Sequence, residues 1–312
     1  ILSYILLIAL GLGSAYLVAQ ISGGLLTKGI LSNQSVVKRR RLSIEERQKA
    51  FKKDSIFTQI VKKDLRDVLK TPVYITSTLL MGIVMPLALM IPIFSRGVSI
   101  SEITDVSSGI FNLLADAFGK QNLVAVVIIA LTVIMLFFAT SATNTAGTSI
   151  TREGKYIWIM QVIPVEARTQ VSARILAAMI IHFISLIPVT IIAFVFLRPP
   201  VLYALLYFVV LFAIGFFASS LGILLDATRP KIDWQTPQQA MKSNFNALIL
   251  TYFTMILSLV IGVGAYILIT NDTFGDNQLI LAAILLVLAF IIAGIILYHL
   301  AVKTLEKKMS SY

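Results

Sequence analysis

Side chains that could perform acid–base, nucleophilic or metal chemistry are scarce in this sequence. It has no cysteine and only two histidines, His182 and His299, which lie too far apart in sequence to suggest a zinc site. It contains neither a Gly-x4-Gly-Lys-Ser/Thr motif for ATP nor a His-Glu-x-x-His metalloprotease motif. A Ser/His hydrolase needs a histidine beside a serine in a small-residue loop, and neither histidine has such a neighbour in sequence. We therefore expect no catalytic residue and no metal site.

His182 is the one ionisable residue well inside a long apolar segment. A charge near the middle of a membrane-spanning helix costs about 2.5–3.5 kcal/mol, so retained ionisable groups commonly mark proton or ion pathways. A single histidine can instead hydrogen-bond a neighbouring helix, and we expect His182 to do this. Asp226 and His299 fall at the ends of apolar segments, where they can be solvated.

Two segments between apolar runs combine charges with aromatic side chains. The first, 151–166, reads Thr-Arg-Glu-Gly-Lys-Tyr-Ile-Trp-Ile-Met-Gln-Val-Ile-Pro-Val-Glu. Its glycine, and Pro164 in the first turn of a helix, predict a short helix–turn–helix. An exposed Trp158 there would form an adhesive patch unless a partner covered it. The second segment, 226–246, contains Asp226, Arg229-Pro230-Lys231 and Trp234. Both segments are equally compatible with anchors in the lipid headgroup zone, which Trp and Lys favour.

These segments must be positioned by helices that cross a membrane. Of the 312 residues, 58% are hydrophobic and 13% are charged, which is too apolar for a chain whose whole outside must be wetted. Apolar runs that can cross about 30 Å of hydrocarbon lie near residues 1–20, 73–94, 122–142, 175–197, 201–225, 246–269 and 279–301. We therefore expect an all-α, polytopic membrane bundle of about seven transmembrane helices.

The positive charges fall on one side of such a bundle. Lys and Arg are abundant after the first, third, fifth and last apolar runs, whereas the other side holds only Arg96, Lys120 and Arg198. The positive-inside rule makes the rich side cytoplasmic, so the C-terminus is expected in the cytoplasm of a cell whose plasma membrane holds the protein. This placement accounts for the net charge of +11 without a nucleic-acid partner.

Residues 56–71 predict a basic amphipathic helix before the second apolar run. Apolar residues recur there at three- and four-residue steps, Lys and Arg occupy the other face, and Pro72 ends the pattern. Such a helix is typical of one lying in the interface of an anionic membrane, although an ordinary solvated helix shows the same pattern.

The third apolar run ends in small and polar residues, among them Ser141, Thr143, Asn144 and Thr145. Such residues let helices approach closely and hydrogen-bond across the contact. They could also line a translocation path. We favour packing, and the two roles are compatible.

The two loop motifs resemble those of ABC transporter permeases of the type-2 exporter class, in particular the bacterial "putative ABC exporter" branch. The resembling residues are Arg152-Glu153-Gly154-Lys155, Trp158 and Pro164-Val165 in the first loop, and Asp226, Arg229-Pro230-Lys231 and Trp234 in the second. The amphipathic segment 56–71 is similar to a connecting helix of that class. The resemblance covers roughly residues 45–305.

The resemblance implies a six-helix permease core that binds a separate cytoplasmic ATPase, which alone would carry ATP and Mg²⁺. The first loop would seat in a groove of that ATPase through Arg152, Glu153, Gly154, Lys155, Trp158, Pro164 and Arg168, and the second loop would add a lesser contact. A second copy or second half would complete the pathway. The implied organisation is a helix of a preceding half at 1–20, a basic linker at 33–72, the permease domain at 73–302 and a cytoplasmic tail at 303–312.

The sequence leaves two other classes of function open. A membrane-embedded enzyme that modifies lipid would need titratable groups that converge near the interface, and the candidates are scattered in sequence. An ion-coupled transporter or channel would need buried charges, which the apolar runs largely lack. The transported substrate is not specified by any residue pattern.

Overall fold

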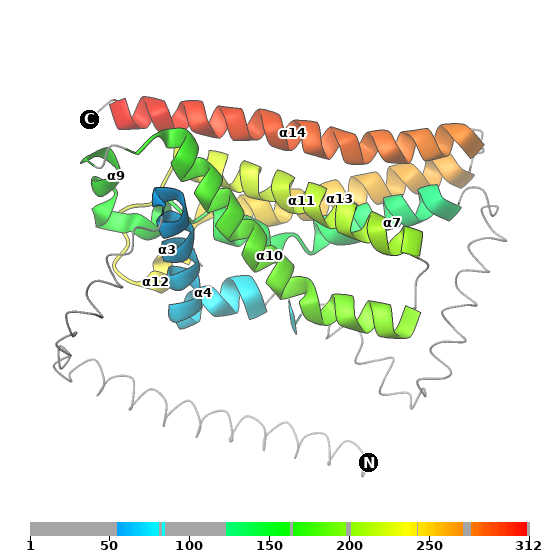
Figure 1. Ribbon diagram of the computed structural model, residues 1–312, viewed down its shortest axis with the longest axis horizontal. Coiled ribbons are helices and arrows are strands. Elements are labelled where there is room, and N and C mark those ends of the chain that lie inside the picture. Colours follow the sequence, from blue (N-terminus) through cyan, green and yellow to red (C-terminus); the bar gives the residue numbers. More distant parts are fainter. Residues whose placement is uncertain are drawn as a thin grey trace, which may run out of the picture. The chain divides into compact units, whose positions relative to one another are not determined.

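The computed structural model describes residues 55–80, 83–84, 123–162, 165–197, 201–241, 243–270 and 276–310. Every regular element in these ranges is helical (Figure 1), which confirms the all-α prediction. In chain order the elements are α3 (Ile56–Lys70), α4 (Pro72–Ile75), η1 (Thr76–Leu80), α7 (Leu123–Phe137), α8 (Thr140–Ala146), η2 (Thr151–Tyr156), α9 (Ile159–Val162), α10 (Ala167–Leu197), α11 (Val201–Thr228), α12 (Pro237–Met241), α13 (Phe245–Thr270) and α14 (Asp276–Ser310).

Four helices among the described residues are long and apolar enough to cross a membrane. They are Ala167–Pro188, Val201–Thr228, Phe245–Leu268 and Gln278–Met309. A fifth crossing exists if Leu123–Phe137 and Ala142–Tyr156, which meet at 44°, form one broken span. The expected spans at 1–20 and over most of 73–94 lie outside the described residues, so the count of seven stays a prediction. The four helices indicate a multi-pass membrane protein.

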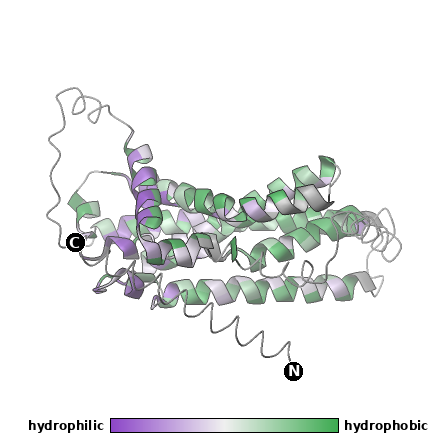
Figure 2. Cartoon of the chain, turned by 90° about the horizontal axis from the view of Figure 1, so that it is seen from below, coloured by the Kyte–Doolittle hydropathy of each residue, from purple (hydrophilic) through white to green (hydrophobic). Residues whose placement is uncertain are grey.

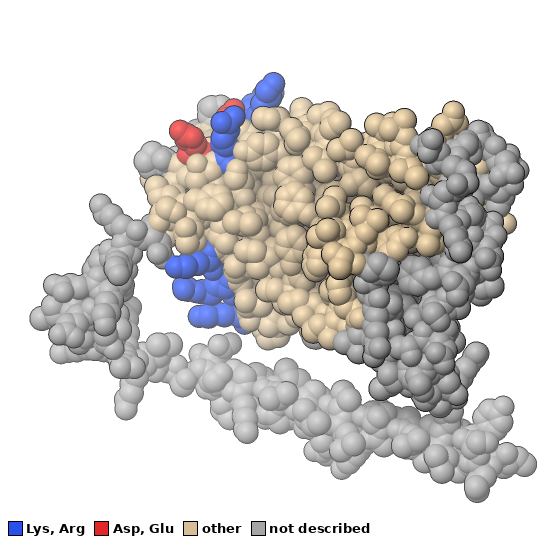
Figure 3. Space-filling view, turned by 45° about the vertical axis from the view of Figure 1, so that its right-hand side comes forward, with Lys and Arg blue, Asp and Glu red and all other residues tan. Residues whose placement is uncertain are grey.

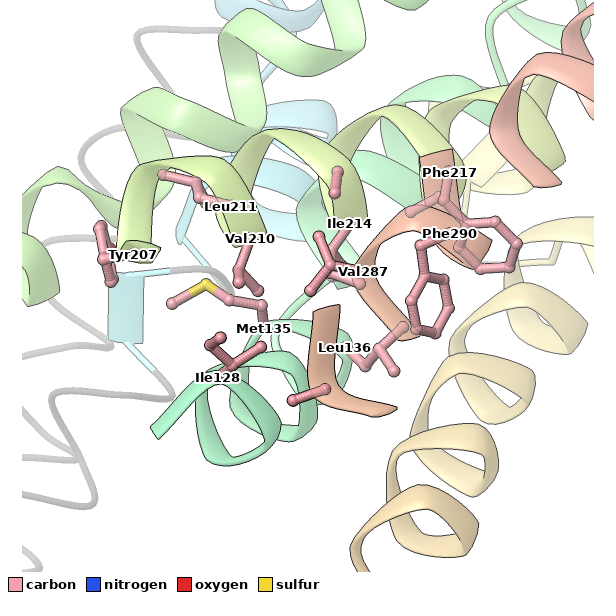
Figure 4. Close-up of a cluster of buried hydrophobic side chains, with 14 of the residues drawn as sticks. Ile128, Met135, Leu136, Tyr207, Val210, Leu211, Ile214, Phe217, Val287 and Phe290 are labelled. Atoms are coloured by element: carbon pink, nitrogen blue, oxygen red, sulfur yellow. The ribbon is translucent and has the colours of Figure 1, made fainter. Parts of the chain in front are cut away.

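Helix α11 forms the centre of this bundle and contacts α7, α8, α10, α13 and α14. Its buried face packs against apolar side chains of α7 and α14 (Figure 4). Phe217 of α11 meets Phe290 of α14 edge-to-face, with ring centroids 5.0 Å apart, and Leu136 of α7 belongs to the same cluster. In a membrane such packing is driven by close van der Waals contact rather than by exclusion of water.

The outer faces of α13 and α14 expose large apolar side chains. Ile256, Leu259 and Val263 of α13 and Leu281 and Ile292 of α14 are among them. Hydrophobic residues follow the length of the long helices, whereas hydrophilic residues gather at one end (Figure 2). A bilayer tolerates such faces because lipid tails are themselves apolar.

The small-residue segment after α7 packs tightly against α11. Thr143, Thr145 and Ala146 are buried, and the backbone at Gly147 approaches Gly222 of α11 closely. A Cβ placed on Gly222 would lie 2.7 Å from Ala146 Cβ and 2.9 Å from the Gly147 nitrogen. The absence of a side chain at position 222 therefore permits this helix contact.

Gly222→Ala is expected to lower the free energy of unfolding by about 1–3 kcal/mol, because the added methyl group forces α8 and α11 apart. Gly264→Ala on α13 is the matched control, since a Cβ there has no neighbour within 4 Å. Denaturation of both purified variants in detergent measures the difference. Equal loss of stability in the two variants would contradict the close contact.

Helix α3 forms where its amphipathic pattern predicts it. Ser55 caps its start by accepting a hydrogen bond from the Thr58 N–H at 3.2 Å, and the helix ends at Lys70, before Pro72. Val61, Asp64 and Val68 are buried where α3 packs on α10. The basic residues Lys62, Arg66 and Lys70 are exposed. The placement of that face in a membrane interface stays a prediction.

Candidate functional site

Charged side chains of the described residues gather at one end of the bundle. On the face in Figure 3, Lys, Arg, Asp and Glu cluster there, away from the middle of the molecule. We call this region the charged end and define it by α3, η2, α9, α12, the last turn of α11 and the last turns of α14. Both loop motifs of the sequence lie in it (Figure 1).

Asp226 fixes the first loop to the end of α11. One carboxylate oxygen, Oδ2, accepts the backbone N–H groups of Ile150 at 2.6 Å and Thr151 at 2.9 Å. The other, Oδ1, accepts the Thr151 hydroxyl at 2.5 Å. Asp226 is 0% exposed, so the expectation of a solvated residue at a helix end is wrong. The last turn of α11 is covered by the loop that Asp226 binds.

The same threonine fastens the second loop to the first. The Thr151 hydroxyl oxygen accepts the Lys231 backbone N–H at 3.0 Å, and the Thr151 carbonyl oxygen accepts the Trp234 indole N–H at 2.7 Å. The Trp234 ring lies against Gly154, whose φ of 53° and ψ of −128° suit glycine. A Cβ at position 154 would lie 2.9 Å from the ring. Thr151 and Gly154 thus join the two loop motifs into one unit.

Alternating charges connect the first loop to α3 and α10. Lys63 pairs with Glu153, and Glu153 Oε1 lies 2.8 Å from Arg174 Nη2. Asp64 then lies between two guanidinium groups, 3.5 Å from Arg174 Nη1 and 3.5 Å from Arg152 Nη2. Because Asp64, Arg152 and Arg174 are buried, each charge depends on its partners for compensation.

Nearby carbonyl and hydroxyl oxygens accept further hydrogen bonds from both arginines, whereas Nε of each arginine and Nη2 of Arg152 have no hydrogen-bond partner among the described residues. Arg174 Nη1 donates to the Ser149 carbonyl at 2.8 Å. Arg152 Nη1 donates to the Thr145 carbonyl at 2.8 Å and to the Thr148 hydroxyl at 2.9 Å. One turn along α3 from this cluster, burial raises the pKa of the Asp67 carboxyl above its ordinary value, and the charges of Lys63 and Arg152 offset part of that rise. These ion pairs and hydrogen bonds form one polar network that connects α3, α10 and the first loop.

We call Thr151, Arg152 and Glu153, which the contacts described above hold in place, the base of the first loop. Beyond this base, the loop exposes a group of apolar side chains. Tyr156 is 67% exposed, Trp158 is 54% exposed and Val162 is 69% exposed. Lys155 beside them is also exposed. We call these four residues the knob. An apolar group on a rigid base is a surface that a protein partner can cover with little loss of conformational entropy.

Two hollows flank the knob. One, of about 220 Å³, lies between residues 157–160, the second loop and the ends of α11 and α14, and Trp158, Ile232 and Leu305 contribute to its largely apolar wall. The other, of about 570 Å³, lies between α3, α9 and the start of α10, and Tyr156 and Glu153 contribute to its lining. Ridges and hollows of this kind are features of surfaces that interlock with a partner.

Comparison of the chain with known protein families, with curated proteins and with solved structures finds no match. The geometry of the charged end must therefore carry the functional assignment. Among the described residues, no group of three or more His, Cys, Asp or Glu side chains could hold a metal ion.

The residues predicted to contact an ATPase divide into two layers. Lys155, Trp158 and Arg168 are exposed, whereas Arg152 and Gly154 are buried and Glu153 is half-buried beneath them. Arg152 and Glu153 therefore brace the loop from below. In the second loop Arg229 is exposed, and Lys231 and Trp234 are half-buried. Pro164 lies outside the described residues.

The residues predicted to serve in helix packing or in a translocation path also fall into two groups. Thr143 and Thr145 are buried in helix contacts, whereas Asn144 borders a cavity. His182 is fully buried with its ring against α11, since a Cβ on Gly215 would lie 2.8 Å from His182 Cδ2. The Ser141 side chain lies outside the described part of the chain.

Sequence reasoning missed Asp64, Thr151 and Arg174 as members of this site. One signal existed for Asp64, which lies three residues after Val61 and four before Val68 and so interrupts the apolar face of α3. A charge on the buried face of a helix indicates a buried partner. Thr151 and Arg174 carry no comparable signal, because their partners are distant in sequence.

Proposed function

We propose that this chain is the membrane-spanning permease subunit of an ATP-binding cassette exporter. The observation that carries this proposal is the exposed knob on a base tied to three elements of the bundle. Through Glu153 the base pairs with α3 and α10, and through Thr151 it bonds α11. A force on the knob would therefore act on α3, α10 and α11 together.

The coupling we propose is a rigid-body movement. A partner that grips Trp158 and Tyr156 displaces η2, and the charge cluster transmits this displacement to α10 through Arg174 and to α11 through Asp226. Packed elements with tight hydrogen bonds shift as units rather than deform. ATP and Mg²⁺ belong to the partner ATPase in this scheme, and a second copy or a second half supplies the other wall of the pathway.

The charge distribution supports a cytoplasmic position for the charged end. Lys and Arg dominate the segments there, and the positive-inside rule assigns such segments to the cytoplasm of a bacterial plasma membrane. An ATPase subunit can reach the knob only on that side.

The two rival functions receive less support from the described residues. For a lipid-modifying enzyme, the half-buried Glu153 is the nearest candidate acid or base, but Arg174 and Lys63 pair with it. For an ion-coupled transporter, the buried carboxylates lie at the charged end, where Asp64 pairs with two arginines and Asp226 accepts hydrogen bonds from the first loop. Both observations favour a structural role for these charges.

The test is co-purification of the chain with a cytoplasmic ATPase. Trp158→Ala is expected to weaken the association by about 2 kcal/mol, or roughly thirtyfold, as loss of an interfacial tryptophan commonly does. Phe245→Ala is the matched control, because Phe245 is a similarly exposed aromatic residue, 69% exposed, at the start of α13. If no ATPase accompanies the intact chain, or if Trp158→Ala binds it as well as Phe245→Ala does, the permease assignment fails.

A further inference from the structure

A cavity of about 500 Å³ lies beside the charged end, apart from the knob. Its walls come from η1, α8, α12 and the first turns of α13. Asn244 marks its boundary with the charged end, because the Asn244 amide donates to the Thr151 hydroxyl oxygen at 3.4 Å. From there the lining continues along α13 to Tyr252. The cavity thus spans the change from the charged loops to the apolar helices.

Asn144 is the central polar group of this cavity. Its amide nitrogen donates to the Ser77 carbonyl oxygen of η1 at 2.9 Å, and its amide oxygen accepts the Thr251 hydroxyl of α13 at 3.4 Å. Asn144 therefore holds the two walls together. The side-chain hydroxyls of Ser77 and Tyr252 also line the cavity and make no hydrogen bond to another residue in the described part of the chain.

Thr76 adds a further hydroxyl, which donates to the Val73 carbonyl oxygen at 2.9 Å. The rest of the described lining is apolar, and none of the described lining residues is charged. Leu248, which is about half exposed, forms part of the apolar wall. A bound ion would give up its hydration without meeting an opposite charge, which is unfavourable. A ligand with neutral donors and acceptors can exchange its hydrogen bonds with water for bonds to hydroxyls and amides. The cavity volume lies within the range of about 300–1,000 Å³ that small-ligand sites occupy.

We propose that this cavity binds the neutral, hydroxylated head group of an amphiphile, with the acyl chain directed along the apolar part of α13. The combination of free hydroxyls, a bridging amide and an apolar wall matches a head group that is polar but uncharged. Tyr252 adds an aromatic ring with a polar tip at the boundary, a position that tyrosine favours at membrane interfaces. This inference does not rest on the proposed transport function, because binding requires no ATPase.

Photolabelling of the purified chain in phosphatidylcholine nanodiscs tests the inference. The probes are a photoactivatable diacylglycerol and a photoactivatable phosphatidic acid with the same acyl chains. The neutral probe is expected to label peptides from η1 and the first turns of α13 more strongly than the charged probe. Unlabelled diacylglycerol is expected to compete, and phosphatidic acid is not.

Tyr252→Phe and Leu248→Trp are expected to leave the fold unchanged, because both alter exposed side chains. Tyr252→Phe removes one open hydroxyl and is expected to weaken diacylglycerol labelling about two- to tenfold, the usual range for one hydrogen bond. Leu248→Trp fills the cavity and is expected to abolish labelling. Thr251→Val removes the hydroxyl that bonds Asn144 and should also reduce labelling. Its control is Thr304→Val on α14, since both hydroxyls also donate to a carbonyl four residues earlier.

Each alternative outcome overturns the inference. Equal labelling by the two probes would mean that the cavity does not select a neutral head group. Labelling that survives Leu248→Trp would place the lipid elsewhere on the protein. No labelling of the original chain by either probe would show that the cavity binds no lipid.

Discussion

Asp226→Ala is expected to lower the free energy of unfolding by about 2–6 kcal/mol. The change leaves the Ile150 and Thr151 N–H groups without their acceptor, and each buried unsatisfied donor costs about 1–3 kcal/mol. It also removes the acceptor of the Thr151 hydroxyl, which fastens the second loop. Loss of folded, monodisperse protein in detergent and a lower unfolding midpoint are the measurements.

Asp226→Asn separates hydrogen bonding from charge. The amide oxygen of asparagine can occupy the position of Oδ2 and accept both N–H groups, while its NH₂ group faces the Thr151 oxygen. We therefore expect Asn at position 226 to cost less than half as much as Ala. Asp233→Ala, at an exposed carboxylate of the same loop, serves as the control and should leave stability unchanged. A large loss of stability in Asp233→Ala, or a small one in Asp226→Ala, would contradict the stabilising role of the Asp226 hydrogen bonds.

Arg174→Ala is expected to cost about 3–5 kcal/mol of stability, the usual result when one member of a buried ion pair is removed. Its guanidinium contacts Asp64, Glu153 and the Ser149 carbonyl. After the change, among the charged partners that the structure describes, Asp64 retains Arg152 and Glu153 retains the more exposed Lys63. Denaturation in detergent, with limited proteolysis of the junction between α3 and α10, measures the loss.

Arg168→Ala is the matched control, because Arg168 is an exposed arginine on the same helix. Exposed charges contribute little to stability, so this variant should unfold as the original protein does. Arg174→Lys should fall between the two, because one ammonium group cannot span the sites that the guanidinium fork reaches. If Arg174→Lys is as stable as the original chain, the fork geometry has no energetic role.

These two buried positions also help to separate folding from partner binding. Variants of Asp226 and Arg174 are expected to weaken ATPase binding, because they loosen the first loop. They are also expected to lower the stability of the protein. Trp158→Ala is expected to weaken binding with little change in stability, because Trp158 is largely exposed. This contrast distinguishes a residue that braces the knob from one that contacts the partner.

Hydrophobic patterning predicted the helices with fair accuracy. The expected spans near 201–225, 246–269 and 279–301 correspond to α11, α13 and α14. Several boundaries differ, and α14 continues to Ser310, beyond the expected end at 301. The expected span 175–197 begins earlier, at Ala167, because the helix continues through the polar residues Gln170 and Arg174, whose side chains are buried against neighbouring elements. The expected span 122–142 breaks after Phe137, where small residues bring α8 against α11.

The sequence indicated the two loops of the candidate site but not the contacts between them, and the role of these loops stays a prediction. The motifs around Trp158 and Trp234 were recognised from composition, and the structure joins them through Thr151. The expectation for Asp226 failed because position along a helix does not reveal which loop covers the helix end. Asp64 was missed because its partners, Arg152 and Arg174, lie about a hundred residues away in sequence.

The sequence by itself determined that this is a helical membrane protein with basic loops, because apolar run length and charge placement are local properties that a bilayer sorts directly. Only the tertiary structure decided which charges are buried, which carboxylate closes the loop and which aromatic side chains stay exposed. Those outcomes depend on contacts between segments distant in the chain. Buried charges must find partners wherever the fold supplies them, and residue patterns do not record that geometry.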